Sequence, residues 1–263
     1  MTLQLDHVII AVHDLAAAIA DYRALGFTVH PGGRHSMSTS HNALVVFADG
    51  AYFELIAWPQ PDPAHRWFNV LAKHGEGLMD FALIPDDVPR AIEAARSRGL
   101  ALNGPIDGGR VRTDGMELKW KTGRQTTFDL PFLCGDITPR EGRVPEGDIR
   151  RHANGAAGIA TLGVAVLDIE ASVARYRALL GEEAGTPVTL PGLGVRAAIV
   201  RLAGTDIVLM APSVEAPSCP FVRELQERLA TRGEGPCAVA IRAKASARLD
   251  PRYTHGVVAE FTA

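Results

Sequence analysis

The sequence is poor in cysteine, in aromatic residues and in long apolar runs. Its three cysteines, Cys134, Cys219 and Cys237, are odd in number and lack metal-ligand spacing, so no disulfide framework is expected. Neither sign of charge dominates, since 27 basic and 30 acidic residues leave a net charge of −3, and no basic patch suits a nucleic acid. The apolar run at the N-terminus is broken by Asp6 and His7, which disfavours a signal peptide or a membrane span. We therefore expect a cytoplasmic protein without nucleic-acid or membrane partners.

The common catalytic signatures are missing as well. The chain has no GxSxG nucleophile elbow, no GxxxxGK[ST] phosphate loop, no GxGxxG turn after a strand and no HExxH motif. These absences argue against an α/β-hydrolase, a P-loop enzyme, a nicotinamide-dependent dehydrogenase and a zinc protease. With 263 residues, of which 47% are hydrophobic, the chain can bury the core of one large domain or two ordinary ones.

What the sequence does contain is an internal repeat. Residues 7–57 correspond without a gap to residues 161–211, at an offset of 154. The tetrapeptide Tyr-Arg-Ala-Leu at 22–25 recurs at 176–179, and Gly50 recurs as Gly204. An ungapped correspondence of this length indicates a duplicated structural unit.

Each unit is predicted to be βαβββ. In the first unit, apolar periodicity and turn residues predict a helix from Leu15 to Leu25, ended by Gly26, and a hairpin turn at Asp49-Gly50. A fainter second copy follows the first, and the fourth copy is too short for its helix and is predicted to be truncated. The predicted strands of the first, second and fourth copies include 5–12, 27–30, 43–47, 52–58, 79–85, 117–121, 127–134, 237–243 and 256–261.

The repeats divide the chain into two predicted domains. Residues 137–157 are rich in Pro, Gly, Arg and Glu, and this composition predicts a linker. We therefore predict that residues 1–140 form an N-terminal domain of two units, and that residues 156–263 form a degenerate C-terminal domain that has lost its ligands. Two further helices, 64–73 and 220–232, are predicted to bridge the paired units.

Two residues of the first unit are candidate site residues. His7 lies on the first strand, and Glu54 lies on the fourth within the apolar segment Tyr-Phe-Glu-Leu-Ile. A buried carboxylate is costly without a partner, so Glu54 needs a metal ion or His7 beside it. Without a metal, apolar surroundings would raise the pKa of Glu54 and suit it as a general base. In the third unit Thr161 and Val208 stand at the corresponding positions and are poor ligands.

Several segments resemble a known superfamily. LDHVIIAVHDL at residues 5–15 and YFELIAW at 52–58 resemble the vicinal oxygen chelate superfamily, which includes glyoxalase I, extradiol dioxygenases and fosfomycin-resistance proteins. More narrowly, HGEGLMDFALIPDDV at 74–88, GMELKWKTG at 115–123 and LPFL at 130–133 are similar to bacterial glyoxalase-like domains. The similarity covers roughly residues 3–135.

The resemblance implies both a fold and a ligand set. The fold is α+β, with tandem βαβββ units paired into half-open barrels, four units in all with the last truncated, and one cleft per pair. The implied metal ligands are His7, Glu54 and Asp80, and Phe132 stands where an acidic residue or a histidine would complete a four-ligand site. The implied cofactor is a divalent metal, Fe, Mn, Ni or Zn, and a site without metal is left open.

The function that we predict is that of a metal-dependent glyoxalase-like enzyme, a lyase or isomerase that moves a proton within a small oxygenated metabolite. Glu54 is the predicted catalytic residue. The predicted substrate-binding residues are His35, Thr39, Asn42 and Trp120. Two alternatives stay open: a non-catalytic small-molecule binding or resistance protein, which Phe132 favours, and an extradiol-type ring-cleavage dioxygenase. The substrate is the predicted partner, and a homodimer is left open.

Overall fold

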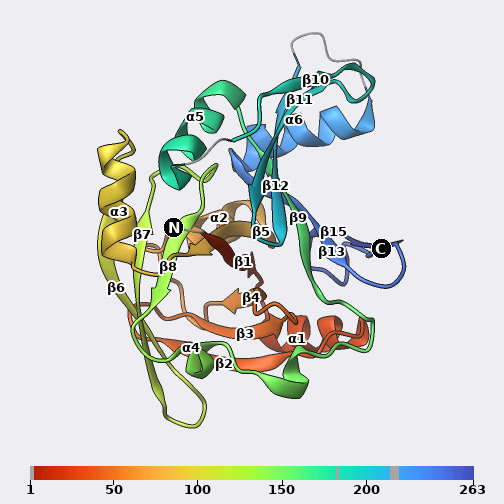
Figure 1. The fold of residues 1–263 in the computed structure, drawn as a ribbon. Helices are drawn as coiled ribbons and strands as arrows, with labels where there is room; N and C mark the ends of the chain where they lie inside the picture. The colour runs from red at the N-terminus through yellow and green to blue at the C-terminus, as the bar shows by residue number, and fades with distance from the viewer. Residues whose placement is uncertain (1–2, 182–183, 214–218) are drawn as a thin grey trace.

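Two β-sheets make up the fold (Figure 1). The structure is a computed structural model that describes residues 3–181, 184–213 and 219–263. The first eight strands close into a barrel in the order β1-β4-β3-β2-β6-β7-β8-β5, and the next seven form an open sheet in the order β10-β11-β12-β9-β13-β15-β14. The predicted α+β fold of paired βαβββ units is confirmed.

The elements follow the order that a duplicated unit requires. The barrel strands are β1 (Gln4–Ala11), β2 (His30–His35), β3 (His41–Val46), β4 (Tyr52–Ala57), β5 (Gly77–Ile84), β6 (Asn103–Val111), β7 (Glu117–Arg124) and β8 (Phe132–Asp136). The open sheet contains β9 (Gly158–Ala165), β10 (Val188–Leu190), β11 (Val195–Leu202), β12 (Thr205–Pro212), β13 (Gly235–Arg242), β14 (Ala247–Arg248) and β15 (Val258–Thr262). The helices are α1 (Leu15–Ala24), α2 (Arg66–His74), α3 (Val88–Ser97), α4 (Arg140–Arg143), α5 (Ile169–Leu180) and α6 (Pro220–Arg232), with 3-10 turns η1 (Gly147–Arg150) and η2 (Pro191–Leu193). None of the helices in the described residues is long and apolar enough to cross a membrane.

The repeated helices begin at the same kind of residue. Asp14 caps α1, where its carboxylate accepts from the backbone N–H groups of Ala16 and Ala17, and Asp168 caps α5 in the same way through Ala171. An aspartate at this position satisfies N–H groups that have no partner within the helix. The caps explain why both copies start their helix at the same point. In the fourth copy, the two-residue strand β14 is the only regular element between β13 and β15, and the predicted truncation is confirmed.

Two units join to make the barrel, and the two joints differ. The strands β1 and β5 pair antiparallel along most of their length. At the opposite joint, β2 and β6 share only the pairs Arg34–Val111 and His35–Arg110. The barrel is therefore closed by a short seam on the side where the loop after His35 lies.

Glycines explain two strands that the sequence pattern placed badly. The strand β2 begins at His30, whereas the pattern predicted a strand over 27–30. In β2 a Cβ on Gly32 would lie 1.9 Å from Oδ1 of Asn42. The strand β6 runs through a segment in which no strand was predicted, and a Cβ on its Gly108 would lie 2.3 Å from Nε1 of Trp120. Both strands need glycine because inward-facing side chains of their neighbours press against them.

The segment 137–157, predicted to be a linker, connects the last strand of the barrel to the first strand of the open sheet, but it is packed against the barrel. It contains α4 and η1, and it places Arg143 and Val144 almost fully out of solvent. Val144 packs with Leu44, Val46 and Tyr52 at one end of the barrel. The Pro, Gly, Arg and Glu content of this segment is typical of a linker. Here, however, Arg143 binds buried carboxylates and Val144 fills a hydrophobic cluster.

The two halves also contact each other through the repeated tyrosines. Tyr22 on α1 donates from its hydroxyl to the backbone carbonyl of Thr254, at 3.3 Å, and Tyr176 on α5 donates to the carbonyl of Asp129, at 2.8 Å. Both tyrosines are fully buried. One hydrophobic cluster includes residues of both sheets, from Leu3 through to Ala259.

Candidate functional site

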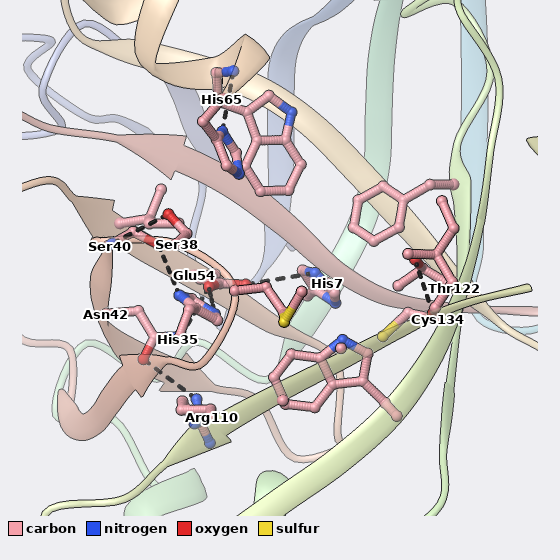
Figure 2. Close-up of a pocket in the computed structure, with 18 of the residues that line it drawn as sticks. His7, His35, Ser38, Ser40, Asn42, Glu54, His65, Arg110, Thr122 and Cys134 are labelled. Atoms are coloured by element: carbon pink, nitrogen blue, oxygen red, sulfur yellow. Dashed lines mark hydrogen bonds and ion pairs between the residues drawn. The ribbon is translucent and has the colours of Figure 1, made fainter. Parts of the chain in front are cut away.

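A cavity of about 350 Å³ lies within the barrel. Strands β1, β3, β4, β6, β7 and β8 contribute to its wall, together with the loop after β2 and the start of α2. Polar and apolar groups share this wall, and Figure 2 shows several of them around Glu54. Apolar walls with a few converging polar groups are typical of small-molecule sites.

Glu54 lies at the centre of the polar part of the wall. Its Oε1 accepts a hydrogen bond from Nδ2 of Asn42 at 2.7 Å and lies 3.3 Å from Nε2 of His35. Its Oε2 lies 3.5 Å from Nε2 of His7. Figure 2 shows Glu54 between the two imidazoles, and we call Glu54, His7, His35 and Asn42 the Glu54 cluster.

His7 is oriented from behind by a second carboxylate. Its Nδ1 lies 2.7 Å from Oδ2 of Asp6, and its ring stacks on Tyr52 with ring centroids 4.7 Å apart. Burial raises the pKa of Asp6, but the charge of Arg143, the hydrogen bond of His7 and the charge of Arg140 outweigh it and hold that pKa well below its ordinary value. Asp6 is therefore ionised and accepts the Nδ1 proton of His7, which directs Nε2 toward Glu54.

His35 is oriented in a similar way by a hydroxyl group. Its Nδ1 lies 2.9 Å from Oγ of Ser40, and its ring meets Trp120 edge-on at a centroid distance of 6.1 Å. The backbone N–H of His35 donates to the carbonyl of Ser40, which closes the loop between β2 and β3. Both histidines thus have one nitrogen held by a neighbour and present the other, Nε2, to Glu54.

The pKa of Glu54 is lowered, not raised, so the expectation of a raised pKa was wrong. Burial raises the pKa of the carboxyl group, but the hydrogen bond and charge of His35, the charge of His7 and the hydrogen bond of Asn42 outweigh burial and bring it to about 2. The sequence pattern showed the apolar strand around Glu54 but not the three polar side chains beside its carboxylate. Glu54 is therefore an ionised hydrogen-bond acceptor at neutral pH and a weak base.

Asp80, the third predicted metal ligand, does not join His7 and Glu54 in the structure. It is fully buried and is not in the cavity wall. One of its oxygens accepts from Arg66 and, at 3.0 Å, from Nε1 of Trp67, and the other accepts from the backbone of Phe81 at 2.9 Å. Within the described ranges, no three His, Cys, Asp or Glu residues are placed to hold a metal ion. Donor placement therefore does not fit the predicted three-ligand metal set.

The predicted substrate-binding residues fall into two groups. His35, Asn42 and Trp120 are in the cavity wall. Thr39 is outside it, and its hydroxyl donates to the carbonyl of Gln60 at 3.1 Å. Phe132, predicted at the fourth ligand position, is in the wall and meets His7 edge-on at a centroid distance of 5.4 Å. Its ring therefore covers one side of His7.

Sequence reasoning missed several wall residues. His65 was not among the predicted site residues, yet it caps α2 and is in the cavity wall, where burial and the charge of Arg124 lower its pKa to about 4. Four arginines are also in the wall, on separate elements and without a shared motif: Arg66, Arg110, Arg124 and Arg143. Cys134 is in the wall too, but burial raises the pKa of its thiol to about 12, so it is not a nucleophile at neutral pH.

A barrel of two βαβββ units with a histidine on its first strand and a glutamate on its fourth, both facing one cavity, defines the vicinal oxygen chelate class. The model of the glyoxalase-like domain family matches residues 5–180, and the chain belongs to that family. No curated protein matches the sequence.

Solved structures share the fold at low sequence identity. A hypothetical protein from Staphylococcus aureus is 15% identical, with a TM-score of 0.72 and 99% of each chain covered. A variant of 4-hydroxymandelate synthase from Streptomyces coelicolor is 15% identical, with a TM-score of 0.63 over 93% of this chain and 72% of that chain. A xylose isomerase-like TIM barrel/4-hydroxyphenylpyruvate dioxygenase fusion protein is 17% identical, with a TM-score of 0.54 over 92% of this chain and 36% of that one. At these identities the likeness shows the fold alone.

Proposed function

We propose that the protein is an enzyme that moves a proton within a small oxygenated metabolite, an isomerase or lyase of the glyoxalase-like type. The observation that supports this best is the Glu54 cluster, in which an ionised carboxylate has an oriented imidazole beside each of its oxygens, next to a cavity of about 350 Å³. Two imidazoles beside one carboxylate can accept a proton at one point of a bound molecule and stabilise charge at another.

The residues that hold the two imidazole rings support a different role in proton transfer for each of them. Because Asp6 holds Nδ1 of His7, Nε2 of His7 is the proton acceptor. A C–H bond next to a carbonyl group breaks, its proton moves to this nitrogen, and the electron pair moves to the carbonyl oxygen. Nε2 of His35 donates to that oxygen, and the negative charge of Glu54 stabilises whichever imidazole gains positive charge. In an isomerisation Nε2 of His35 gives its proton to that oxygen and takes up the proton of the hydroxyl group on the first carbon, which becomes the new carbonyl group, while His7 returns its proton to the former carbonyl carbon.

A divalent metal, Fe, Mn, Ni or Zn, is the cofactor predicted from the sequence, and bound near the cluster it would polarise the substrate oxygen as a Lewis acid. The imidazole and carboxylate groups fit such a metal in kind but not in placement, because the two imidazoles flank opposite oxygens of Glu54 and Asp80 is engaged by Arg66 and Trp67. Metal analysis of protein purified without chelators tests this prediction. Absence of stoichiometric metal, with no effect of added Fe, Mn, Ni or Zn on turnover, contradicts it.

Solvent deuterium exchange tests the proton transfer directly. A panel of small hydroxyketones and hydroxyaldehydes, neutral and carboxylate-bearing, is incubated with the protein in D₂O, and proton NMR follows loss of the signal from the carbon next to the carbonyl. We expect exchange or isomerisation of at least one compound, and a loss of about 100-fold or more in His7→Gln and Glu54→Gln. The exposed Glu260→Gln serves as the control with wild-type rates. No exchange of any compound, with or without added metal, would overturn the proposal.

A binding protein without turnover is the second candidate, and the observation that favours it is Phe132. Its ring covers one side of His7, where a polar residue would be expected in a metal site. Stabilisation of the protein by a ligand that it does not convert supports this candidate.

Oxygen uptake with added iron and a dihydroxylated aromatic compound tests the third candidate, a ring-cleavage dioxygenase.

A further inference from the structure

The four arginines of the cavity wall differ in whether a carboxylate lies beside their guanidinium groups. Arg66 forms an ion pair with Asp80, and Arg143 forms ion pairs with Asp6 and Asp136. Arg110 and Arg124 form no ion pair with any described residue. Buried cations normally have a carboxylate partner, so these two need an explanation.

Arg110 is held by other polar groups. It donates to Oδ1 of Asn42 at 3.3 Å and to the backbone carbonyl of Arg143 at 3.1 Å. The first of these bonds fixes the amide of Asn42, so that its Nδ2 points to Glu54. Arg110 thus orients Asn42, a member of the Glu54 cluster. Arg124 is then the cavity-wall arginine whose lack of a partner is still unexplained.

The guanidinium group of Arg124 has aromatic neighbours but no hydrogen bond to any residue of the described ranges. Its guanidinium carbon lies 4.4 Å from the ring centroid of Phe132 and 5.0 Å from that of Trp67. Its side-chain nitrogens have no partner, yet none of them is fully buried. Since Arg124 is in the cavity wall, its N–H donors reach the cavity. Aromatic rings contact the flat face of a guanidinium group and leave its N–H edge free. That free edge is the part of an arginine that binds a carboxylate through two parallel hydrogen bonds.

The surroundings of Arg124 destabilise its charged guanidinium group when it has no partner, and they would favour a bound anion. Burial and the charge of Arg66 lower the pKa of Arg124, which means that its charged form is poorly solvated there. The charges of Asp80 and Glu54 act in the opposite direction, so Glu54 is near enough to influence Arg124. The wall of the same cavity includes Ile56, Phe132 and Trp67, which suit the apolar body of a small molecule.

We propose that Arg124 binds the carboxylate of the substrate, and that the substrate is a small carboxylic acid with an apolar body. The inference rests on the proposed function, since it takes the Glu54 cluster as the place where the other end of the same molecule reacts. It names the substrate class: a monocarboxylate whose reacting carbon is separated from the carboxylate by an apolar segment that contacts Phe132 and Trp67.

Calorimetry with a matched pair of probes tests the anion site. The probes are 3-phenylpropanoate and its neutral isostere 3-phenylpropanamide, with inorganic phosphate as a third. We expect the wild-type protein to bind the acid at least about tenfold more tightly than the amide, because a charge-assisted bidentate contact is worth that much or more. Arg124→Gln should reduce the preference to about twofold or less, and Arg124→Lys should keep part of it.

Several calorimetric results would overturn the assignment of Arg124 as a carboxylate-binding residue. Equal binding of acid and amide, or no binding of either up to about 10 mM, overturns it. So does a preference that is lost in Arg110→Gln but kept in Arg124→Gln. Tighter binding of phosphate than of the acid overturns the assignment to a carboxylate. Binding does not require turnover, so His7→Gln should lose the exchange reaction and keep the preference for the acid, which separates a failure of this proposal from a failure of the proposed function.

Stability of the ligand-free protein supplies an independent readout. A ligand-binding cation without a partner destabilises the protein that carries it, so Arg124→Met should raise the melting temperature or leave it unchanged. If Arg124 only supports the packing of Phe132 and Trp67, the same substitution lowers the melting temperature. A lowered value, with an intact acid preference in Arg124→Gln, assigns Arg124 to structure and overturns the proposal.

Discussion

The carboxylate of Glu54 is ionised although it is buried, because polar side chains that favour its charged form lie beside both of its oxygens. Asn42 and His35 lie beside Oε1, and His7 lies beside Oε2. A carboxylate in an apolar strand without these side chains would have a raised pKa. The direction of the shift therefore depends on three residues from three other strands, and their positions decide the chemistry of Glu54.

Glu54→Gln should change how stability depends on pH. The pKa of Glu54 falls from 4.5 to about 2 on folding, so its contribution is present above pH 4.5 and is lost as the pH falls toward 2. A shift of this size corresponds to about 3 kcal/mol. Urea unfolding at about pH 5 and about pH 3 should show a smaller loss of stability in Glu54→Gln than in the wild type. Glu260→Gln is the control with the wild-type loss, and an equal loss in all three proteins would refute the prediction.

His65→Asn should remove a second pH dependence. The pKa of His65 falls from 6.5 to about 4 on folding, so the unfolded chain binds more protons in this range and stability is lost as the pH drops from 6.5 toward 4. Asparagine is a good helix cap and should replace the bond from His65 to the backbone of Trp67. Melting temperatures at about pH 7 and about pH 5 should differ less in the variant than in the wild type. An unchanged difference would count against a role for His65.

Much of the site was predictable from the sequence, and the missing part has a physical reason. The repeat marked His7 and Glu54, since their third-unit counterparts Thr161 and Val208 lack ligand chemistry while the packing residues persist. The arginines and His65 were not marked, because nothing in a single strand or helix shows which side chain meets a cavity built by other elements. Likewise, the sequence does not show that Arg66 and Trp67 engage Asp80.

Among the elements, helices were predicted better than strands. Their caps and apolar periodicity are local signals, and 220–232 matches α6 as observed. The strand β6 contains three glycines and a proline, so its sequence is typical of a turn, and only pairing with β7 makes it a strand. The segment 127–134 was placed too early, since β8 begins at Phe132.

The segment around α4 should be essential for the barrel. Arg143 is buried there and binds Asp6, Asp136 and the hydroxyl of Tyr52. Arg143→Met should cost about 3–5 kcal/mol, because it leaves Asp6 with a buried charge and one arginine fewer. Arg151→Met is the matched control, since the pair of Arg151 with Asp148 is exposed and should contribute about 0.5 kcal/mol or less. Urea unfolding measures both, and equal effects would contradict the assigned role of Arg143.

At the scale of the whole molecule, the duplication reappears as reciprocal contacts. Tyr22 of the first copy bonds to Thr254 in the second half of the chain, and Tyr176 of the third copy bonds to Asp129 in the first half. Arg98, directly after α3, donates to the backbone of α5, and Arg232 on α6 donates to the carbonyls at the C-terminal end of α2. The tyrosine of the repeated tetrapeptide therefore joins the two halves in both copies.

These contacts lead us to expect that the two halves unfold together, and the tryptophans allow a test. Trp58, Trp67 and Trp120 all lie in the N-terminal half, so their fluorescence reports on the barrel alone, whereas far-UV circular dichroism reports on both sheets. Tyr176→Phe leaves the buried carbonyl of Asp129 without this donor and should cost about 1–3 kcal/mol. The exposed Tyr253→Phe should cost about 0.5 kcal/mol or less. Because α5 belongs to the other half, coupling requires both signals to shift to the same lower temperature in Tyr176→Phe. A shift in circular dichroism with unchanged fluorescence would mean that the halves unfold independently.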